Sequence, residues 1–203
     1  MKRKYQVFVS STYEDLREAR REVILYLLDN NCIPVGMEQF PSSNMEQMEY
    51  IKKMLEDCDY YILILAGKYG TLDSDGVSFT EKEFNYAQKK GIPIMSFLVK
   101  DIDSLQGFQL EKSDEKKTKL LSFREKVCKD KLVNFYTNID DLKAKIGTSL
   151  YRCIEDFPRN GWIRASSSLE VGEEIPQDII KRIRDEIITD EEIDELYKLL
   201  GEN

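Results

Sequence analysis

Histidine is absent from all 203 residues of the sequence. This absence excludes Ser-His-Asp triads, Cys-His dyads and every metal site that depends on imidazole, so any acid–base chemistry must use carboxylates, lysine, tyrosine or cysteine. Cysteine is scarce as well, and the four cysteines are scattered without a C-x-x-C pair. We interpret Cys32, Cys58, Cys128 and Cys153 as reduced packing residues and expect no bound metal.

Long apolar runs are also missing. No run approaches the roughly 18 residues that a membrane-spanning helix needs. The N-terminus, MKRKYQVFVSS, lacks the long apolar core and the cleavage site of a signal peptide. We therefore expect a cytoplasmic globular protein that has no membrane partner, in keeping with 41% hydrophobic and 33% charged residues.

The sequence has no surplus of positive charge, since its formal net charge is −8. Residues 169–203 alone contain twelve acidic and four basic residues, so the excess of negative charge belongs to the C-terminal tail. The rest of the chain has equal numbers of acidic and basic residues and lacks the positive field that attracts nucleic acids. We expect no nucleic-acid partner.

What the sequence does contain is an alternation of short apolar strands and amphipathic helices. The predicted strands cover residues 4–10, 32–35, 60–66, 94–99 and 132–136. The predicted helices begin at the capping box Ser11-Thr12-Tyr13-Glu14, at residues 42–44, at Ser78 or Thr80, at Leu120, and at Asn138 or Asp140. Residues 100–119, with their DEKK run, are predicted to form an exposed loop. Five strands alternating with helices predict a parallel sheet covered on both faces.

Composition divides the chain into three parts. Residues 1–158 are predicted to form the α/β domain, residues 159–172 a linker, and residues 173–203 an acidic tail of two amphipathic helices. Such short helices are not stable alone, so they must pack on the body or on another copy. We therefore expect a homo-oligomer.

The stretch of residues 59–98 organises the chain, because it joins a fully apolar strand to a glycine loop and a capped helix. Gly67 and Gly70 follow the strand directly, and glycines there allow the backbone to approach a ligand. In open α/β sheets, ligands bind beyond the carboxyl ends of the strands. We therefore expect the functional site in the loop of residues 67–79 and the first turn of its helix.

Three motifs, VFVSSTYEDLREAR, PVGMEQF and AGKYGTLDSDGVSFTEKEFNYA, resemble a TIR-like domain of unknown function that begins many bacterial and animal signalling proteins. The resemblance covers roughly residues 4–156. It implies a flavodoxin-like, TIR-like three-layer sandwich with a five-stranded parallel sheet. It also implies assembly through TIR-type contacts and a sensor or NTPase partner in trans. In bacteria it would imply anti-phage immunity or synthesis of a nucleotide signal.

The segment TEKEFNYA is similar to the T-x-x-E-x-G-Y-A block of nucleoside deoxyribosyltransferases. The resemblance implies that Glu83 is the catalytic carboxylate, acting at the ribose of a nucleoside or of NAD, with Thr80 and Tyr86 as matching site residues. Asn85 departs from the pattern, since the transferases have glycine there. The implied enzyme is an N-glycosidase that takes NAD or another nucleotide as its substrate and needs no cofactor.

This chemistry is compatible with a site that has no histidine. Cleavage of an N-glycosidic bond passes through an oxocarbenium-like state that one carboxylate can stabilise or capture. Hydroxyl and backbone N–H groups at the end of the first strand are candidate ligands for a phosphate. Residues of the loops that follow the strands are candidates for lining the substrate site. The expected substrate-binding residues are Ser10, Ser11, Thr12, Arg17, Glu38, Gly67, Tyr69, Gly70, Thr80 and Tyr86.

The same residues also have structural interpretations that the sequence leaves open. Glu81 and Glu83 each stand three residues after a possible N-cap, so either one closes a capping box or acts on the ligand. Residues 10–12 fit a helix cap, and Gly67 and Gly70 fit a tight turn. The alternative function is a TIR-like module that senses a nucleotide or joins protein partners without turnover.

Overall fold

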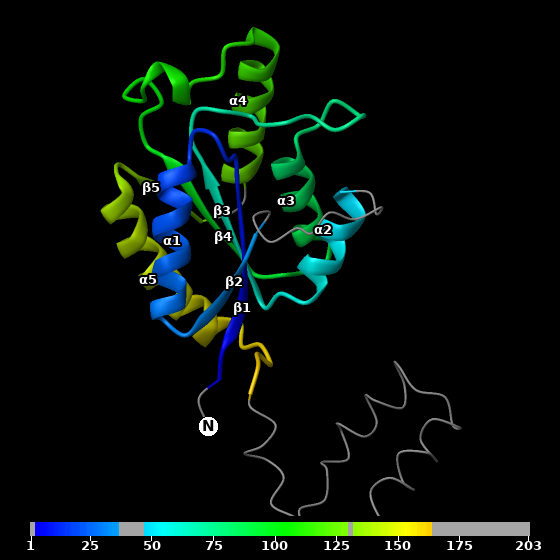
Figure 1. Cartoon of the computed structure of the whole chain (residues 1–203), viewed down its shortest axis with the longest axis vertical. Coiled ribbons are helices and arrows are strands. Elements are labelled where there is room, and N and C mark those ends of the chain that lie inside the picture. The colour runs from blue at the N-terminus through cyan, green and yellow to red at the C-terminus, as the bar shows by residue number, and fades with distance from the viewer. Residues whose placement is uncertain (1–2, 37–46, 130–131, 164–203) are drawn as a thin grey trace, which may run out of the picture. The chain divides into compact units, whose positions relative to one another are not determined.

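The computed structural model describes residues 3–36, 47–129 and 132–163, which belong to one compact unit. The predicted tail helices lie outside the described residues. The described part is a five-stranded parallel sheet, in the order β2-β1-β3-β4-β5, with helices on both faces (Figure 1). The elements are β1 (Tyr5–Ser11), α1 (Arg17–Asp29), β2 (Cys32–Val35), α2 (Gln47–Glu56), β3 (Tyr60–Leu65), α3 (Phe79–Lys89), β4 (Ile94–Val99), the 3-10 helix η2 (Gly107–Gln109), α4 (Asp114–Cys128), β5 (Val133–Tyr136) and α5 (Ile139–Asp156).

This strand order is that of the flavodoxin-like fold and confirms the predicted fold class. β1 and β3 are the inner strands where the order reverses, so the crevice at their carboxyl ends is the expected place for a ligand. All residues of β3 are buried, which explains its uninterrupted apolar sequence.

Alternating side chains of the strands build two separate cores. One core lies under α1 and α5, and the other lies under α2, α3 and α4 (Figure 1). Val9 and Ile62 point into the first core, whereas Phe8 and Leu63 point into the second. Neighbouring residues at the end of β1 therefore serve opposite faces of the sheet.

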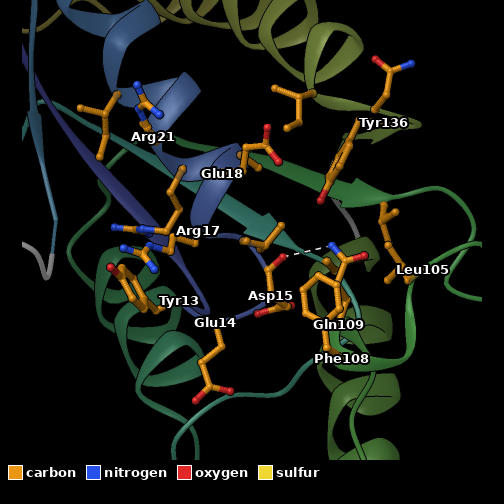
Figure 2. A pocket seen from close by; sticks show the side chains of 18 of the residues that line it. Tyr13, Glu14, Asp15, Arg17, Glu18, Arg21, Leu105, Phe108, Gln109 and Tyr136 are labelled. Carbon is orange, nitrogen blue, oxygen red and sulfur yellow. Dashed lines mark hydrogen bonds between the residues drawn. The ribbon is translucent and has the colours of Figure 1, made fainter.

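The predicted start of the first helix is wrong. β1 continues through Ser11, and α1 begins only at Arg17, without a side-chain cap. The Ser11 hydroxyl accepts a hydrogen bond from Arg20 Nη1 at 2.9 Å and donates one to the Thr12 carbonyl at 2.8 Å, so it is not used as a helix cap. Figure 2 shows the intervening turn, with Tyr13, Glu14 and Asp15 ahead of α1.

The predicted exposed loop of residues 100–119 is also partly wrong, because α4 begins at Asp114. Ser113 is its N-cap, and the first turn carries Asp114 and Glu115, which complement the positive end of the helix dipole. The DEKK run is therefore the first turn of a helix. Lys116 extends from this turn to the Gly70 carbonyl, with its Nζ atom at 3.1 Å.

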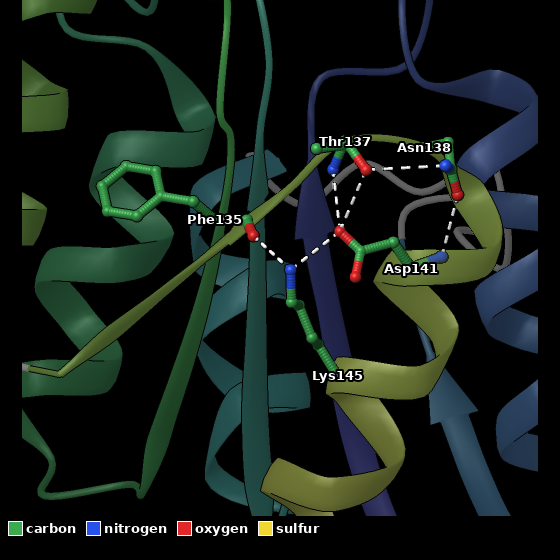
Figure 3. Close-up of polar contacts among 5 residues, drawn as sticks. All are labelled: Phe135, Thr137, Asn138, Asp141 and Lys145. Carbon is green, nitrogen blue, oxygen red and sulfur yellow. Dashed lines mark hydrogen bonds and ion pairs between the residues drawn. The ribbon is translucent and has the colours of Figure 1, made fainter.

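The junction between β5 and α5 is held by side chains at the helix start (Figure 3). Asn138 caps α5 by accepting a hydrogen bond from the Asp141 amide at 2.9 Å. The Asp141 carboxylate accepts the Thr137 amide at 2.9 Å and pairs with Lys145 at 2.7 Å. Lys145 also donates to the Phe135 carbonyl at 2.6 Å, so the strand end and the helix are tied together.

Beyond α5, Trp162 and Lys4 exchange two backbone hydrogen bonds, of 2.7 and 2.9 Å, although the indole remains about half exposed. Among the described residues, no helix combines the length and the apolar character required to cross a membrane.

Asn138→Ala should lower the free energy of unfolding by about 1 kcal/mol, because the first turn of α5 loses its side-chain cap. Urea denaturation followed by circular dichroism would measure the change. Thr118→Ala, on the exposed side of α4, is the matched control and should stay within about 0.5 kcal/mol of the wild type. Equal effects of the two substitutions would show that the cap contributes nothing.

Candidate functional site

A cleft of about 440 Å³ lies at the carboxyl ends of β1 and β3, where the strand order reverses. Four of the predicted site residues, Ser11, Thr12, Gly70 and Thr80, line it. The other residues that line the cleft are Tyr13, Glu14, Asp15, Gln47, Lys68, Thr71, Phe79, Glu111 and Lys116.

Glu83 lies on α3, three residues after Thr80, and is only 1% exposed. Its Oε2 atom accepts a hydrogen bond from the Ser10 hydroxyl of β1. Because Ser78 caps α3 by accepting the Glu81 amide at 3.2 Å, Glu83 lies inside the helix rather than at a capping position. The capping interpretation of Glu83 is therefore wrong, and that of Ser78 is confirmed.

Glu81, the alternative carboxylate, is engaged elsewhere. It accepts a hydrogen bond from the Tyr69 hydroxyl at 2.6 Å and pairs with Lys126 of α4 at 2.9 Å. Tyr69 is buried and packs edge-on against Phe123. Neither Glu81 nor Tyr69 lines the cleft, and both join α3 to α4.

The hydroxyl residues at the end of β1 do not form a single cluster. Ser10 points toward α3 and binds Glu83, whereas Ser11 points toward α1 and binds Arg20. Arg20 is 3% exposed and also donates to the Val9 carbonyl at 3.0 Å. Of the three predicted residues, Ser11 and Thr12 line the cleft and Ser10 lies with Glu83 beneath it.

The two glycines after β3 have different surroundings. Gly70 has φ +97°, and a Cβ atom there would stand 2.9 Å from the Thr12 methyl group, so glycine keeps the cleft open. Gly67 lies instead against the segment after β4. Its carbonyl accepts the Glu111 amide at 2.8 Å, and an added Cβ atom would overlap the Gln109 carbonyl.

Two further predicted residues, Tyr86 and Arg17, are not brought to this cleft, and a third, Glu38, cannot be placed. The Tyr86 hydroxyl donates to Glu56 of α2, well away along α3. Arg17 lines a second cavity, with its guanidinium 5.9 Å from the centre of the Tyr13 ring. Glu38 lies outside the described residues.

Two lysines in the cleft were not predicted from the sequence. Lys68 pairs with Glu14 at 2.7 Å, which raises the pKa of the lysine, and Lys116 lies on the first turn of α4. Both could offer positive charge to a phosphate. Lys116 belongs to the DEKK run, which the sequence predicts only as part of an exposed loop.

Asp15, another residue that lines the cleft, was not predicted from the sequence as a site residue. It is 5% exposed and lies in the turn between β1 and α1. Burial raises the pKa of its carboxyl group, although the Thr12 hydroxyl and the amides of Asp15 and Lys68 partly offset this rise. Buried carboxylates with perturbed pKa values are common at functional sites.

Comparison with known families gives one match: residues 6–151 fit the model of a family described as "Domain of unknown function (DUF4062)". No curated protein matches the chain. Among solved structures, the chain is similar to one titled "Structure of the activated Roq1 resistosome directly recognizing the pathogen effector XopQ (TIR domains)". The sequence identity is 12% and the TM-score 0.42, over 91% of this chain and 99% of that chain.

Gly67→Ala should lower the free energy of unfolding by about 1–3 kcal/mol, because the methyl group displaces the Gln109 carbonyl. Gly107→Ala is the matched control, since a Cβ atom at Gly107 has no neighbour within 4 Å. Thermal and urea denaturation of both variants would test this. A destabilisation by Gly107→Ala as large as that by Gly67→Ala would contradict the packing role of Gly67.

Asp15→Asn should make the protein more stable at neutral pH. Because burial raises the folded-state pKa above the unfolded value near 3.8, wild-type stability falls as pH rises through this interval. The stability advantage of the variant should therefore be small near pH 4 and larger at pH 7, as measured by urea denaturation at each pH.

Asp141→Asn provides a control of opposite sign. Lys145 holds the pKa of Asp141 below its ordinary value, so removing that charge should cost more stability at pH 7 than at low pH. A parallel pH trend in the two variants would contradict the assignment of opposite pKa shifts.

Proposed function

The chain belongs to the family described as "Domain of unknown function (DUF4062)", and since that description assigns no activity, we propose a function from the site itself. We propose that the chain is a nucleotide-directed N-glycosidase, which cleaves or transfers the base of NAD, a nucleoside or another nucleotide. Glu83 is the proposed catalytic carboxylate, and the cleft between β1 and β3 is the proposed substrate site.

The observation that carries this proposal is the position of Glu83. A carboxylate that is 1% exposed is costly to bury, and buried charge is weak evidence for a stabilising role. Glu83 lies beside the strand end at which the flavodoxin-like fold binds ligands, and Ser10 orients it there. A functional role accounts for a charged group in this place.

The proposed chemistry needs few groups. Glu83 would stabilise or capture the oxocarbenium-like state as the base leaves. Nicotinamide in NAD is already a cationic leaving group and requires no protonation. Lys68 and Lys116 would contact the phosphates, and the Thr80 hydroxyl, on the first turn of α3, would contact the sugar.

One observation favours the alternative function, a nucleotide-binding module without turnover. Glu83 does not line the cleft, so its carboxylate must become accessible before it can act on a sugar. A cleft that binds nucleotide above a permanently covered carboxylate would sense the ligand without cleaving it. Assembly into an oligomer, or a sensor or NTPase partner, would then convert binding into a signal.

The decisive experiment compares the wild type with Glu83→Gln and Glu81→Gln. Each protein is incubated at high concentration with NAD and a panel of nucleosides and nucleotides, and released base is measured by chromatography. We expect Glu83→Gln to lose at least about 100-fold in rate, as for removal of an essential catalytic group. Glu81→Gln should keep activity within a few-fold, since Glu81 contacts α4 and not the cleft.

Equal base release by the wild type and Glu83→Gln would move the chemistry away from Glu83. If the wild type releases no base but binds a nucleotide, and Lys116→Ala weakens that binding, the binding-module alternative is favoured. Circular dichroism of each variant would verify that the fold is retained.

A further inference from the structure

A second and larger cavity, of about 890 Å³, also borders the turn at residues 13–15 (Figure 2). It is bounded by α1, by the segment after β4 and by the start of α5. Its volume is in the range of sites that bind small organic molecules. Of the described residues expected to contact substrate, only Arg17 lines this cavity.

Two buried polar side chains that line this cavity, Asp15 and Tyr136, have no hydrogen bond of good geometry within the described part of the chain. Asp15 and Tyr136 are each 5% exposed, and among the described residues no group makes a hydrogen bond of good geometry to the Asp15 carboxylate or the Tyr136 hydroxyl. Figure 2 shows both residues at the cavity, with Gln109 donating to the backbone carbonyl of Asp15 at 3.1 Å. Burial and the charge of Asp15 raise the pKa of Tyr136, so its hydroxyl remains a hydrogen-bond donor.

The Asp15 carboxylate is a hydrogen-bond acceptor and the Tyr136 hydroxyl is a donor. Together they suit a ligand that presents N–H donors beside an acceptor oxygen. A buried carboxylate requires N–H donors, and a buried hydroxyl requires an acceptor, because polar groups left unpaired in a protein interior are costly. A lactam ring, in which an N–H group stands beside a carbonyl, presents both. In guanine a second N–H group adjoins the first, which matches the two oxygens of a carboxylate.

The walls and the rim of the second cavity favour two further properties in a ligand. Leu105 and Phe108 form an apolar wall that suits a flat ring, and Phe108 is 60% exposed. Arg17 and Arg21 lie four residues apart on α1 and therefore on one side of the helix. Within the described chain neither arginine forms an ion pair, although Glu18 also reaches the cavity. Two arginines at the rim suit an anionic group, above all a phosphate.

We propose that this cavity is a binding site for a purine lactam nucleotide, in which Asp15 accepts the ring N–H groups, Tyr136 donates to the ring carbonyl, and Arg17 and Arg21 bind the phosphate. The site shares the turn at residues 13–15 with the cleft near Glu83 but does not depend on the reaction proposed there. Adenine lacks the lactam pair, so an adenine nucleotide leaves the buried groups unsatisfied and is rejected.

The test uses guanosine 5′-monophosphate, adenosine 5′-monophosphate and guanosine as probes, with binding to the full chain measured by isothermal titration calorimetry. We expect guanosine monophosphate to bind at least about tenfold more tightly than adenosine monophosphate. Guanosine should bind more weakly than its monophosphate, and Arg17→Ala should reduce this difference.

Two near-isosteric variants keep the test specific. Tyr136→Phe and Asp15→Asn should each weaken binding of guanosine monophosphate by about tenfold or more, with the fold verified by circular dichroism. Arg152→Ala is the matched control, because Arg152 is exposed on α5 and lines neither cavity, and it should leave the affinity unchanged. Lys116→Ala reports on the other cleft, which Lys116 lines.

Equal binding of the two monophosphates, no binding of either at millimolar concentration, or an affinity that Tyr136→Phe leaves unchanged would overturn the proposal. Loss of affinity in Lys116→Ala alone would place the nucleotide in the other cleft and would also overturn it. The base-release assay with Glu83→Gln is independent of all these results, so the two proposals can fail separately.

Discussion

The carboxyl end of β1 delivers polar groups into two apolar cores at once, and the surrounding structure satisfies them. Ser11 faces the core under α1, where Arg20 binds it, and Ser10 faces the core under α3, where it binds Glu83. Two buried ionisable side chains, Arg20 and Glu83, thus lie on opposite faces of one strand end. Because each would be costly without hydrogen bonds, the positions of α1 and α3 relative to β1 are constrained together.

That constraint also explains which parts of the fold were readable from sequence. β2 and β4 coincide with their predicted ranges, because a short apolar run between breakers depends on local composition. The start of α1 was not predictable in this way. The pattern from Ser11 to Glu14 is a good capping box, yet Arg20, nine residues along the chain, engages the Ser11 hydroxyl.

The candidate site was predictable only where local sequence determines it. The cleft lies where the glycine loop after β3 indicated, and Thr80 and Gly70 line it as expected. Lys116 could not be placed, because only tertiary structure brings the first turn of α4 over Gly70. Tyr86 matched a motif in sequence, but it lies one turn beyond Glu83 on α3 and meets Glu56 instead.

The turn at residues 13–15 is a wall common to both cavities. A shared wall provides a means of thermodynamic linkage, since a displacement of the turn by an occupant of one cavity would alter the shape of the other. Such linkage is reciprocal: whatever factor the first occupant imposes on the affinity of the second, the second imposes on the first. The short connection between β1 and α1 is therefore the element through which an occupant of one cavity would act on the other.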